Sequence, residues 1–492
     1  MLRKIRISLA ALMIICITWL FVDFTGTAHG IVPITWLPKI QLLEAIFALN
    51  VAVVLILLVI TLIFGRIYCS VVCPLGILQD IFGWFGKRAK KNRYTYSAAK
   101  RGLRIVCLLL LVVSGLLGVG TLFQLLAPYS TFGIIATNLL QPIWQAGNNV
   151  LAAIAEHYDS YAFYHSNIWM RSLPSLIISI VAIVALAVLA WRNGRTFCNT
   201  ICPVGTFLSF FAKFSWMKVH FDVEKCKNCS LCTKNCKASC IDFKTHHVDY
   251  TRCVTCGDCI ESCKFGALKY SPVRHHQNTQ NDPDNSRRSF LLSSALLATA
   301  TMAQQKDKIM DGGLADIKDK VAPDRQTPLT PPGSHSQQNF EQRCTGCQLC
   351  ISECPNEVLR PSSDLMHLMM PTMSYERGYC RPECTRCSEV CPTGAILPIK
   401  REDKSSTQIG HAVWIKKNCV PLTDGVECGN CARHCPVGAI EMVPSDPDDE
   451  ESPSVPAVNE ARCIGCGACE NLCPARPFSA IYVEGHEVHK EV

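Results

Sequence analysis

The arrangement of cysteines constrains this chain more than any other feature of its sequence. The chain has 31 cysteines among 492 residues, and most of them fall into six sets of four, each within a short stretch. A disulfide scaffold is typical of small secreted proteins, whereas tight cysteine clusters in a chain of this size indicate metal binding. The chain is therefore expected to fold around several metal sites, distributed over about two to four domains.

Two of the sets stand in tandem after residue 220 and share the spacing Cys-x2-Cys-x2-Cys-x3-Cys. In bacterial ferredoxins with this spacing, three close thiolates bind one [4Fe-4S] cluster and the fourth binds the neighbouring cluster. This logic predicts one cluster on Cys226, Cys229, Cys232 and Cys263, and a second on Cys253, Cys256, Cys259 and Cys236. Cys240 is an alternative ligand to Cys236. Zinc is the alternative metal, but the three-plus-one pattern, given twice, favours clusters.

Four further sets follow residue 340, and each ends in Cys-Pro. Their members are Cys344, Cys347, Cys350 and Cys354; Cys380, Cys384, Cys387 and Cys391; Cys419, Cys428, Cys431 and Cys435; and Cys463, Cys466, Cys469 and Cys473. Such modules have little room for a hydrophobic core, so cluster binding is expected to supply most of their folding free energy. Six sets predict six [4Fe-4S] clusters.

The first half of the chain has four apolar stretches that approach or exceed the ~20 residues needed to cross a bilayer. They are about Ile7–Val22, Leu42–Phe64, Ile105–Leu126 and Leu176–Trp191. Each is predicted to be a transmembrane helix, although the first is alternatively a cleaved secretory signal. Basic residues crowd the segment between the second and third stretches, which places that segment in the cytoplasm. The net charge of +8 therefore reports membrane orientation rather than nucleic-acid binding.

Two nearly identical segments, RIYCSVVCPLG and RTFCNTICPVG, follow the second and fourth apolar stretches. Each contains Cys-x-x-x-Cys-Pro, and a spacing of four puts both thiols on one side of a helical turn. The four thiols belong to Cys69, Cys73, Cys198 and Cys202. If the pairs meet, they form a redox or metal site suited to soft thiolate chemistry; the alternative is two structural thiol pairs. Cys16 and Cys107, alone in apolar helices, are interpreted as core residues.

An internal segment, SRRSFLLSSALLATATMA from Ser286 to Ala303, is similar to a twin-arginine export signal. Arg287 and Arg288 precede a modest apolar run, and polar linkers flank it. The alternative is a short amphipathic helix in a linker. Because iron–sulfur clusters are built in the cytoplasm, a domain that carries them must fold before export, and this pathway carries folded proteins. The run is expected to remain as a fifth crossing or to be cut after Ala300 or Ala303.

These motifs resemble two families of periplasmic nitrate reduction. Residues 1 to about 275 resemble the NapH family of membrane quinol-oxidising accessory proteins. Residues from about 284 onward resemble the NapG family of periplasmic four-cluster proteins, so the chain looks like a fusion of the two. The resemblance implies that the first of the last four motifs shares ligands with the fourth, and the second with the third. The implied sets are Cys344, Cys347, Cys350 with Cys473; Cys463, Cys466, Cys469 with Cys354; Cys380, Cys384, Cys387 with Cys435; and Cys419, Cys428, Cys431 with Cys391.

The expected architecture has four parts: a four-helix membrane domain (1–219), a two-cluster α+β ferredoxin domain (220–275), a linker with the internal signal (276–339) and a four-cluster ferredoxin domain (340–492). The expected location is the bacterial cytoplasmic membrane, with the first ferredoxin in the cytoplasm and the second in the periplasm. The expected function is electron transfer from quinol to a periplasmic redox protein or reductase, with no legible quinone site. The alternatives are a redox sensor or maturation factor, or a cytoplasmic ferredoxin–quinone relay.

Overall fold

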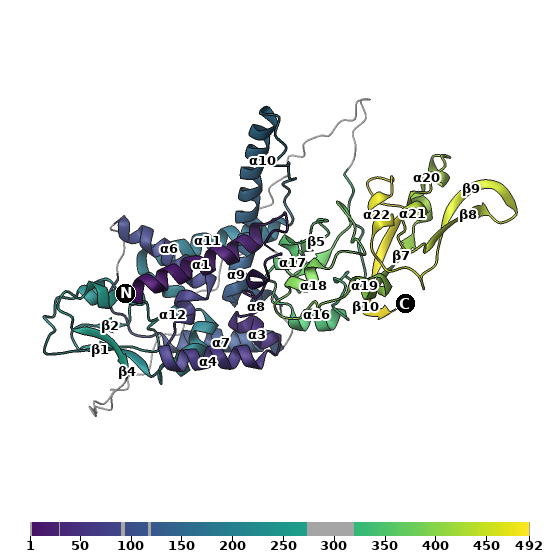
Figure 1. Ribbon diagram of the computed structural model, residues 1–492. Coiled ribbons are helices and arrows are strands. Elements are labelled where there is room, and N and C mark those ends of the chain that lie inside the picture. The colour runs from purple at the N-terminus through teal and green to yellow at the C-terminus, as the bar shows by residue number, and fades with distance from the viewer. Residues whose placement is uncertain (1, 29, 90–93, 117–119, 273–318, 492) are drawn as a thin grey trace, which may run out of the picture.

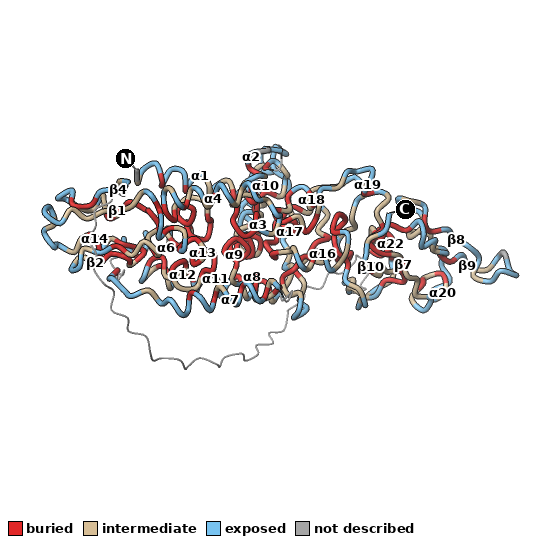
Figure 2. The backbone as a smooth tube through the Cα atoms, turned by 90° about the horizontal axis from the view of Figure 1, so that it is seen from below, coloured by how far each residue is buried: buried red, intermediate tan, exposed pale blue. Residues whose placement is uncertain are grey.

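The computed structural model describes residues 2–28, 30–89, 94–116, 120–272 and 319–491. The molecule is elongated, and a helical region fills its middle (Figure 1). Residues 217–272 form a small unit at one end, and residues 319–491 extend from the other end. Figure 2, turned by 90°, shows the same order along the long axis. The internal signal segment, Ser286–Ala303, lies outside the described residues.

The helical region is built from apolar helices that pack around one core. They are α1 (Leu2–Val22), α2 (Val32–Thr35), α3 (Leu42–Phe47), α4 (Val51–Phe64), α5 (Tyr68–Val71), α6 (Pro74–Arg88), α7 (Arg101–Leu116), α8 (Gly120–Leu126), α9 (Pro128–Ile135), a π-helical segment (Ala136–Leu140), α10 (Gln141–His157), α11 (Leu173–Asn193), α12 (Thr196–Thr200) and α13 (Pro203–Ala212). Helix α10 projects from the rest of the region (Figure 1). Helix α1 runs from the small unit to the opposite end, a length of roughly 30 Å for its 21 residues.

The prediction of four long membrane helices is not confirmed. Among the described residues, two helices are long and apolar enough to cross a membrane, Arg3–Val22 and Leu173–Asn193. The stretch Leu42–Phe64 is broken between α3 and α4, where Leu49 has a φ of 54° and the Asn50 side chain accepts a hydrogen bond from the Val53 backbone N–H at 3.3 Å. This cap starts a new helix, so α4 has only 14 residues.

The third apolar stretch also differs from its predicted bounds. Helix α7 begins at Arg101, before the predicted Ile105, and ends at Leu116, whereas α8 covers Gly120–Leu126. Apolar composition identified the segment but did not predict that its first helix begins at Arg101.

The unit at residues 217–272 has two short antiparallel strand pairs that enclose its cysteine loops. Its elements are β1 (Met217–Phe221), α14 (Leu231–Lys234), β2 (Ile241–Asp242), β3 (His247–Val248), α15 (Asp258–Ser262) and β4 (Leu268–Pro272). Strand β1 pairs with β4, β2 pairs with β3, and α14 packs against α15. The two cysteine loops therefore form the two halves of one small α+β unit.

The C-terminal region repeats this organisation twice. Most of its buried residues form a second hydrophobic core, whereas Cys347, Leu349 and Val390 pack with the core of the helical region. Its elements are α16 (Gln337–Arg343), α17 (Leu349–Ser352), β5 (Leu359–Pro361), β6 (Pro371–Met373), α18 (Arg386–Val390), α19 (Arg401–Ser406), β7 (Thr407–Trp414), a 3-10 turn (Lys416–Asn418), α20 (Val420–Thr423), α21 (Asn430–Arg433), β8 (Ile440–Asp446), β9 (Asp449–Val458), α22 (Ala468–Leu472) and β10 (Ile481–Glu491). Strand β5 pairs with β6, β7 with β10, and β8 with β9.

Two segments that the sequence predicts to be irregular are integrated into this region. The acidic, proline-containing sequence of segment 445–456 predicts a solvated loop. In the structure this segment forms much of the β8–β9 hairpin, in which Ile440 faces Val458 and Val443 faces Val455. Cross-strand apolar pairs stabilise a hairpin, and the acidic composition concealed them.

The end of the predicted linker also packs against the C-terminal region. Leu329 is buried in its core, and Arg325 forms an ion pair with the buried Glu470 at 2.6 Å. A buried carboxylate needs such a partner. Residues 320–339 are therefore placed with the C-terminal region, before the predicted boundary at 340.

Candidate iron–sulfur sites

The first predicted cluster set converges in the structure. Cys226, Cys229, Cys232 and Cys263 line one small cavity between the loop before α14 and the end of α15. The remaining wall is largely apolar and includes Phe221, Phe243 and Phe265. The displaced fourth cysteine thus joins three thiols of the other loop, as the ferredoxin spacing predicts.

The second set also gathers, and it includes Cys240. The side-chain hydrogen bond from Cys240 lowers the pKa of Cys236 to about 7 despite burial, and the two sulfur atoms are 3.6 Å apart. Burial raises the pKa of Cys259, and neighbouring Cys256, Cys253 and Cys236 raise it further. Both candidates for the fourth ligand therefore lie beside the loop thiols, so the choice between Cys236 and Cys240 stays open.

In the C-terminal region, each set of three thiols lies beside the fourth cysteine of its sequence neighbour. Burial and then the nearby Cys347, Cys344 and Cys391 raise the pKa of Cys350. One cavity is lined by Cys354, Cys380, Cys384 and Cys387, and another by Cys435, Cys463, Cys466 and Cys469. Burial and then Cys428, Cys473 and Cys419 raise the pKa of Cys431 to about 11.

The nested ligand sharing implied by the NapG resemblance is therefore wrong for this chain. The structure brings Cys391, not Cys473, to the first set, and Cys473, not Cys391, to the third. The second set receives Cys354 in place of Cys435, and the fourth set receives Cys435 in place of Cys354. The physical reason is local folding: α17 packs against α18, and α21 against α22, as α14 packs against α15. Each pair of consecutive motifs therefore forms its own compact unit.

The displaced cysteines also accept backbone hydrogen bonds, which suit thiolate sulfur. The pairs are Ala267 N to Cys263 Sγ at 3.3 Å, Ile396 N to Cys391 Sγ at 3.4 Å, Ala439 N to Cys435 Sγ at 3.2 Å and Ala480 N to Cys473 Sγ at 3.3 Å. Left-handed glycines form the turn after three of these cysteines, at Gly266, Gly394 and Gly438. Hydrogen bonds to sulfur tune the potential of a cluster.

The cysteine thiols of these units are not arranged around a single metal ion. Within the described parts of the chain, no three Cys, His, Asp or Glu side chains are grouped closely enough to hold a metal ion by themselves. The thiols instead line the walls of small cavities with largely apolar surroundings. This donor set suits a [4Fe-4S] cluster, which would supply one-electron redox chemistry.

The two Cys-x-x-x-Cys-Pro pairs meet in the helical region. Cys73 and Cys202 are the N-caps of α6 and α13, and Pro74 and Pro203 start those helices. All four thiols are buried. Burial raises the pKa of Cys73, and Cys198, Cys202 and Cys69 raise it further. We refer to Cys69, Cys73, Cys198 and Cys202 as the four-thiol site.

Two arginines that sequence reasoning missed hold the repeats together. Arg66 NH2 donates to the Cys198 carbonyl oxygen at 3.2 Å, and Arg195 NH1 donates to the Cys69 carbonyl oxygen at 2.5 Å. Each arginine begins its own repeat and bonds to the first cysteine of the other repeat. Both are buried. The arginine that begins both RIYC and RTFC is the sequence feature that could have indicated this role.

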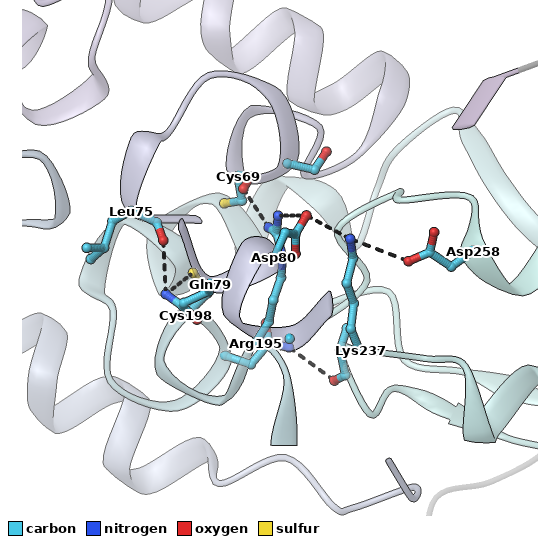
Figure 3. A network of polar contacts seen from close by, with 12 residues as sticks. Cys69, Leu75, Gln79, Asp80, Arg195, Cys198, Lys237 and Asp258 are labelled. Carbon is cyan, nitrogen blue, oxygen red and sulfur yellow. Dashed lines mark hydrogen bonds and ion pairs between the residues drawn. The ribbon is translucent and has the colours of Figure 1, made fainter. Parts of the chain in front are cut away.

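A network of charges connects the four-thiol site to the unit at 217–272 (Figure 3). Arg195 forms a two-point ion pair with Asp80 at 2.7 Å, and Lys237 contacts the same carboxylate at 2.7 Å. Burial opposes ionisation of Asp80, but Arg195 and Lys237 outweigh it and hold its pKa well below the usual range. Lys237 also forms an ion pair with Asp258 at 3.4 Å. Asp258 lies between Cys256 and Cys259 in the sequence.

The opposite end of the helical region contacts the C-terminal cysteine loops. Gly133 in α9 lies so close to the Cys347 carbonyl oxygen that there is no room for a Cβ atom. Asn138 Nδ2 donates to Gln348 Oε1 at 2.9 Å, and Gln348 Nε2 donates to Ser175 Oγ at 3.1 Å. The first C-terminal cysteine set therefore lies directly against this end.

The single cysteines differ in environment. Cys107 is buried in α7, in agreement with a core role, whereas Cys16 in α1 is half-buried and packs against the core.

Comparison with protein families supports iron–sulfur binding in three parts of the chain. A 4Fe-4S binding domain matches residues 46–93 and 172–223, which include the four-thiol site. A second 4Fe-4S binding domain matches residues 246–269, and a 4Fe-4S dicluster domain matches residues 426–476. The four-thiol segments are therefore similar to sequences described as cluster-binding.

Curated relatives cover about a third of the chain. The methylamine utilization ferredoxin-type protein MauM of Methylobacillus flagellatus is 30% identical over 166 residues, which are 33% of this chain and 70% of MauM. MauM of Paracoccus denitrificans is 30% identical over 168 residues, 32% of this chain and 73% of the relative. The ferredoxin-type protein NapF of Escherichia coli K12 is 29% identical over 160 residues, 32% of this chain and 87% of NapF. The chain is thus a ferredoxin-type iron–sulfur electron-transfer protein, and it belongs to the family that includes MauM.

Proposed function

We propose that this protein is anchored in the bacterial cytoplasmic membrane, takes electrons from quinol and relays them to a periplasmic redox partner. The observation that carries the proposal is the placement of the cysteine sets. One unit of cluster sites lies at one end of the apolar helical region, two lie at the other, and the four-thiol site lies within that region. This arrangement suits electron transfer across a membrane.

The surface of the helical region supports a membrane location. Large apolar side chains are exposed along four helices, and soluble proteins rarely expose contiguous apolar surface of this kind. They include Ile5, Leu9 and Leu12 on α1; Leu55, Ile56 and Val59 on α4; Ile105, Leu109 and Val113 on α7; and Ile177, Val181 and Val188 on α11. Lipid would cover this surface and remove it from water.

Charge supports the orientation. The last turn of α6 carries Lys87 and Arg88, close to the end that holds the unit at 217–272. By the positive-inside rule this end faces the cytoplasm, and the C-terminal region faces the periplasm. The described residues of the first end stop at residue 272, and those of the C-terminal region start at residue 319. The internal twin-arginine-like segment lies in this interval.

The resemblance to fused NapH and NapG proteins supplies the identity of the donor. On that resemblance the donor is quinol and the acceptor belongs to a system like periplasmic nitrate reduction. MauM relatives are named for methylamine utilization, so the acceptor is proposed only as a periplasmic reductase or redox protein. One quinol releases two electrons and two protons, and each cluster accepts one electron.

Quinol reduction of the C-terminal clusters tests this proposal. We expect decylubiquinol to reduce the clusters of the purified holoprotein in lipid nanodiscs, observed as bleaching of their visible absorbance. Cys198→Ser should abolish reduction of the C-terminal clusters by quinol, while dithionite still reduces them. Cys107→Ser, outside every predicted site, is the matched control. Slow oxidation of the clusters by quinone with no quinol-driven reduction would contradict the relay and favour a sensor.

A further inference from the structure

A cavity lies between α1 and α6 at the end of the helical region that holds the 217–272 unit. Most of its wall is apolar. From α1 it is lined by Ile7, Ala11 and Ile14, and from α6 by Ile77, Ile81 and Trp84. Ile7, Ile81 and Trp84 are also exposed on the outer surface. The cavity therefore opens onto the apolar surface that the proposed membrane covers, and an apolar molecule can enter from lipid.

The inner end of this cavity is polar, and it holds two buried polar atoms without protein partners. Gln79 Oε1 is an unpaired acceptor, and Arg6 Nε is an unpaired donor. The rest of each group is fixed: Arg6 NH1 bonds to Asp80 at 3.1 Å, and Gln79 Nε2 donates to Cys198 Sγ at 3.3 Å. Leaving a buried donor or acceptor unpaired costs about 1–3 kcal/mol. A ligand with a hydroxyl group and a second oxygen would satisfy both atoms.

The same polar end adjoins two predicted redox sites. Gln79 connects it to Cys198 of the four-thiol site (Figure 3). Lys237 and Asp258, which also line the cavity, connect it to the loop of Cys256 and Cys259. Arginine and lysine side chains outnumber carboxylates in the lining, so the site favours an oxygen that gains negative charge as its proton leaves.

We infer that this cavity is the quinol-binding site of the protein. The ring lies at Gln79 and Arg6, and the isoprenoid tail follows the apolar wall of α1 toward lipid. The inference rests on the proposed function, which supplies quinol as the donor, but it names a location that the motifs do not reveal. Oxidation of one quinol to quinone would release two protons to water at the cytoplasmic side. It would also release two electrons, which clusters held by the adjoining cysteines would accept one at a time. A phospholipid is the competing occupant, since it is also amphipathic.

Adjacent residues on α1 offer a matched pair of variants. Ala11 and Leu12 are both exposed, but only Ala11 lines the cavity. Ala11→Trp places an indole in the cavity, whereas Leu12→Trp places the same side chain on the lipid-facing surface. Cluster content of both holoproteins, measured by iron and visible absorbance, reports on folding.

Photolabelling of the holoprotein in nanodiscs with an azido-ubiquinone measures binding without requiring turnover. We expect label on α1 and α6 peptides, displaced by decylubiquinone. Ala11→Trp should weaken labelling about tenfold, equivalent to about 1.4 kcal/mol, and slow cluster reduction by decylubiquinol, whereas Leu12→Trp should match the wild type.

The outcomes separate this inference from the proposed function. If decylubiquinol reduces the wild-type clusters but the two variants behave alike, the cavity is not the quinol site, although quinol remains the donor. Displacement of the label by phosphatidylglycerol, but not by decylubiquinone, would assign the cavity to lipid and overturn the inference. Labelling at the predicted peptides without any quinol-driven reduction would instead sustain the binding site and reject the proposed function.

Discussion

Arg66 NH2 donates a hydrogen bond to the carbonyl oxygen of Cys198 at 3.2 Å, and this bond joins the two cysteine repeats. Its other terminal nitrogen donates to Asn199 Oδ1 and to the Thr251 carbonyl oxygen, both at 3.0 Å. A single buried side chain thus connects the first repeat, the second repeat and the unit at 217–272. The guanidinium group has the several fixed donors that this position requires.

Replacement of Arg66 should therefore disturb the four-thiol site. Arg66→Gln leaves buried acceptors without donors, at a cost of about 1–3 kcal/mol for each. We expect a lower melting temperature and reduced iron content, and Arg66→Lys should rescue only part of the loss because a lysine presents one nitrogen. Arg101→Gln, at an exposed position, is the control. Unchanged stability and iron in Arg66→Gln would show that the bonds between the repeats do not support the site.

Alkylation of serine variants can show which fourth cysteine completes each cysteine set of the C-terminal region. If Cys391 completes the first set, Cys391→Ser should expose Cys344, Cys347 and Cys350 to iodoacetamide in the holoprotein, because their cluster loses a ligand. Peptide mass spectrometry identifies the alkylated residues. Cys473→Ser, the reciprocal control, should expose Cys419, Cys428 and Cys431. The opposite assignment in the two variants would restore the nested order.

We predict that His489 makes the stability of the C-terminal region depend on pH. Burial, assisted by His335 and His486, lowers the pKa of His489 to about 4, and the Nε2 atom lies 3.0 Å from Thr330 Oγ1. An unfolded histidine titrates near pH 6.5, so the unfolded state binds the extra proton first and stability falls as the pH drops from about 6.5 toward 4.

Amide hydrogen exchange of β10 measures this effect while the clusters remain in place. Between pH 7.5 and 5.5, the wild type should lose about 1 kcal/mol more opening free energy than His489→Gln. His434→Gln, at an exposed position, serves as the control variant. Equal losses in wild type and His489→Gln would exclude His489 as the source of the pH dependence.

The cysteine spacing predicts much of the site because ligand geometry is local. Three thiols on one short loop converge in any ferredoxin-like fold, and the duplicated Cys-x-x-x-Cys-Pro segments indicated that two pairs could meet. The spacing does not state which loop supplies the fourth ligand, since that depends on packing between helices such as α17 and α18. The resemblance to NapG implied the wrong fourth ligand for the C-terminal cysteine sets.

Composition predicts the helical region but not its interruptions. The helix break at Asn50 depends on one side-chain cap and on the positive φ of Leu49. A hydropathy average over many residues does not detect either feature. Similarly, the acidic residues of segment 445–456 concealed the β8–β9 hairpin, in which apolar pairs such as Val443 and Val455 face each other. Arg66 and Arg195 occupy the same position in the two repeats, which the sequence shows. Only the structure shows that each arginine donates a hydrogen bond to the other repeat.

We propose that the cluster-bearing units of this protein lie on opposite sides of the membrane. The most direct test is protease treatment of intact spheroplasts, with detection of the region after Cys344, in the wild type and in Arg287→Lys/Arg288→Lys. We predict digestion of this region in the wild type and protection in the variant, because in our proposal the arginine pair directs export. Protection of both proteins, while a periplasmic control protein is digested, would contradict the account and place all the clusters in the cytoplasm.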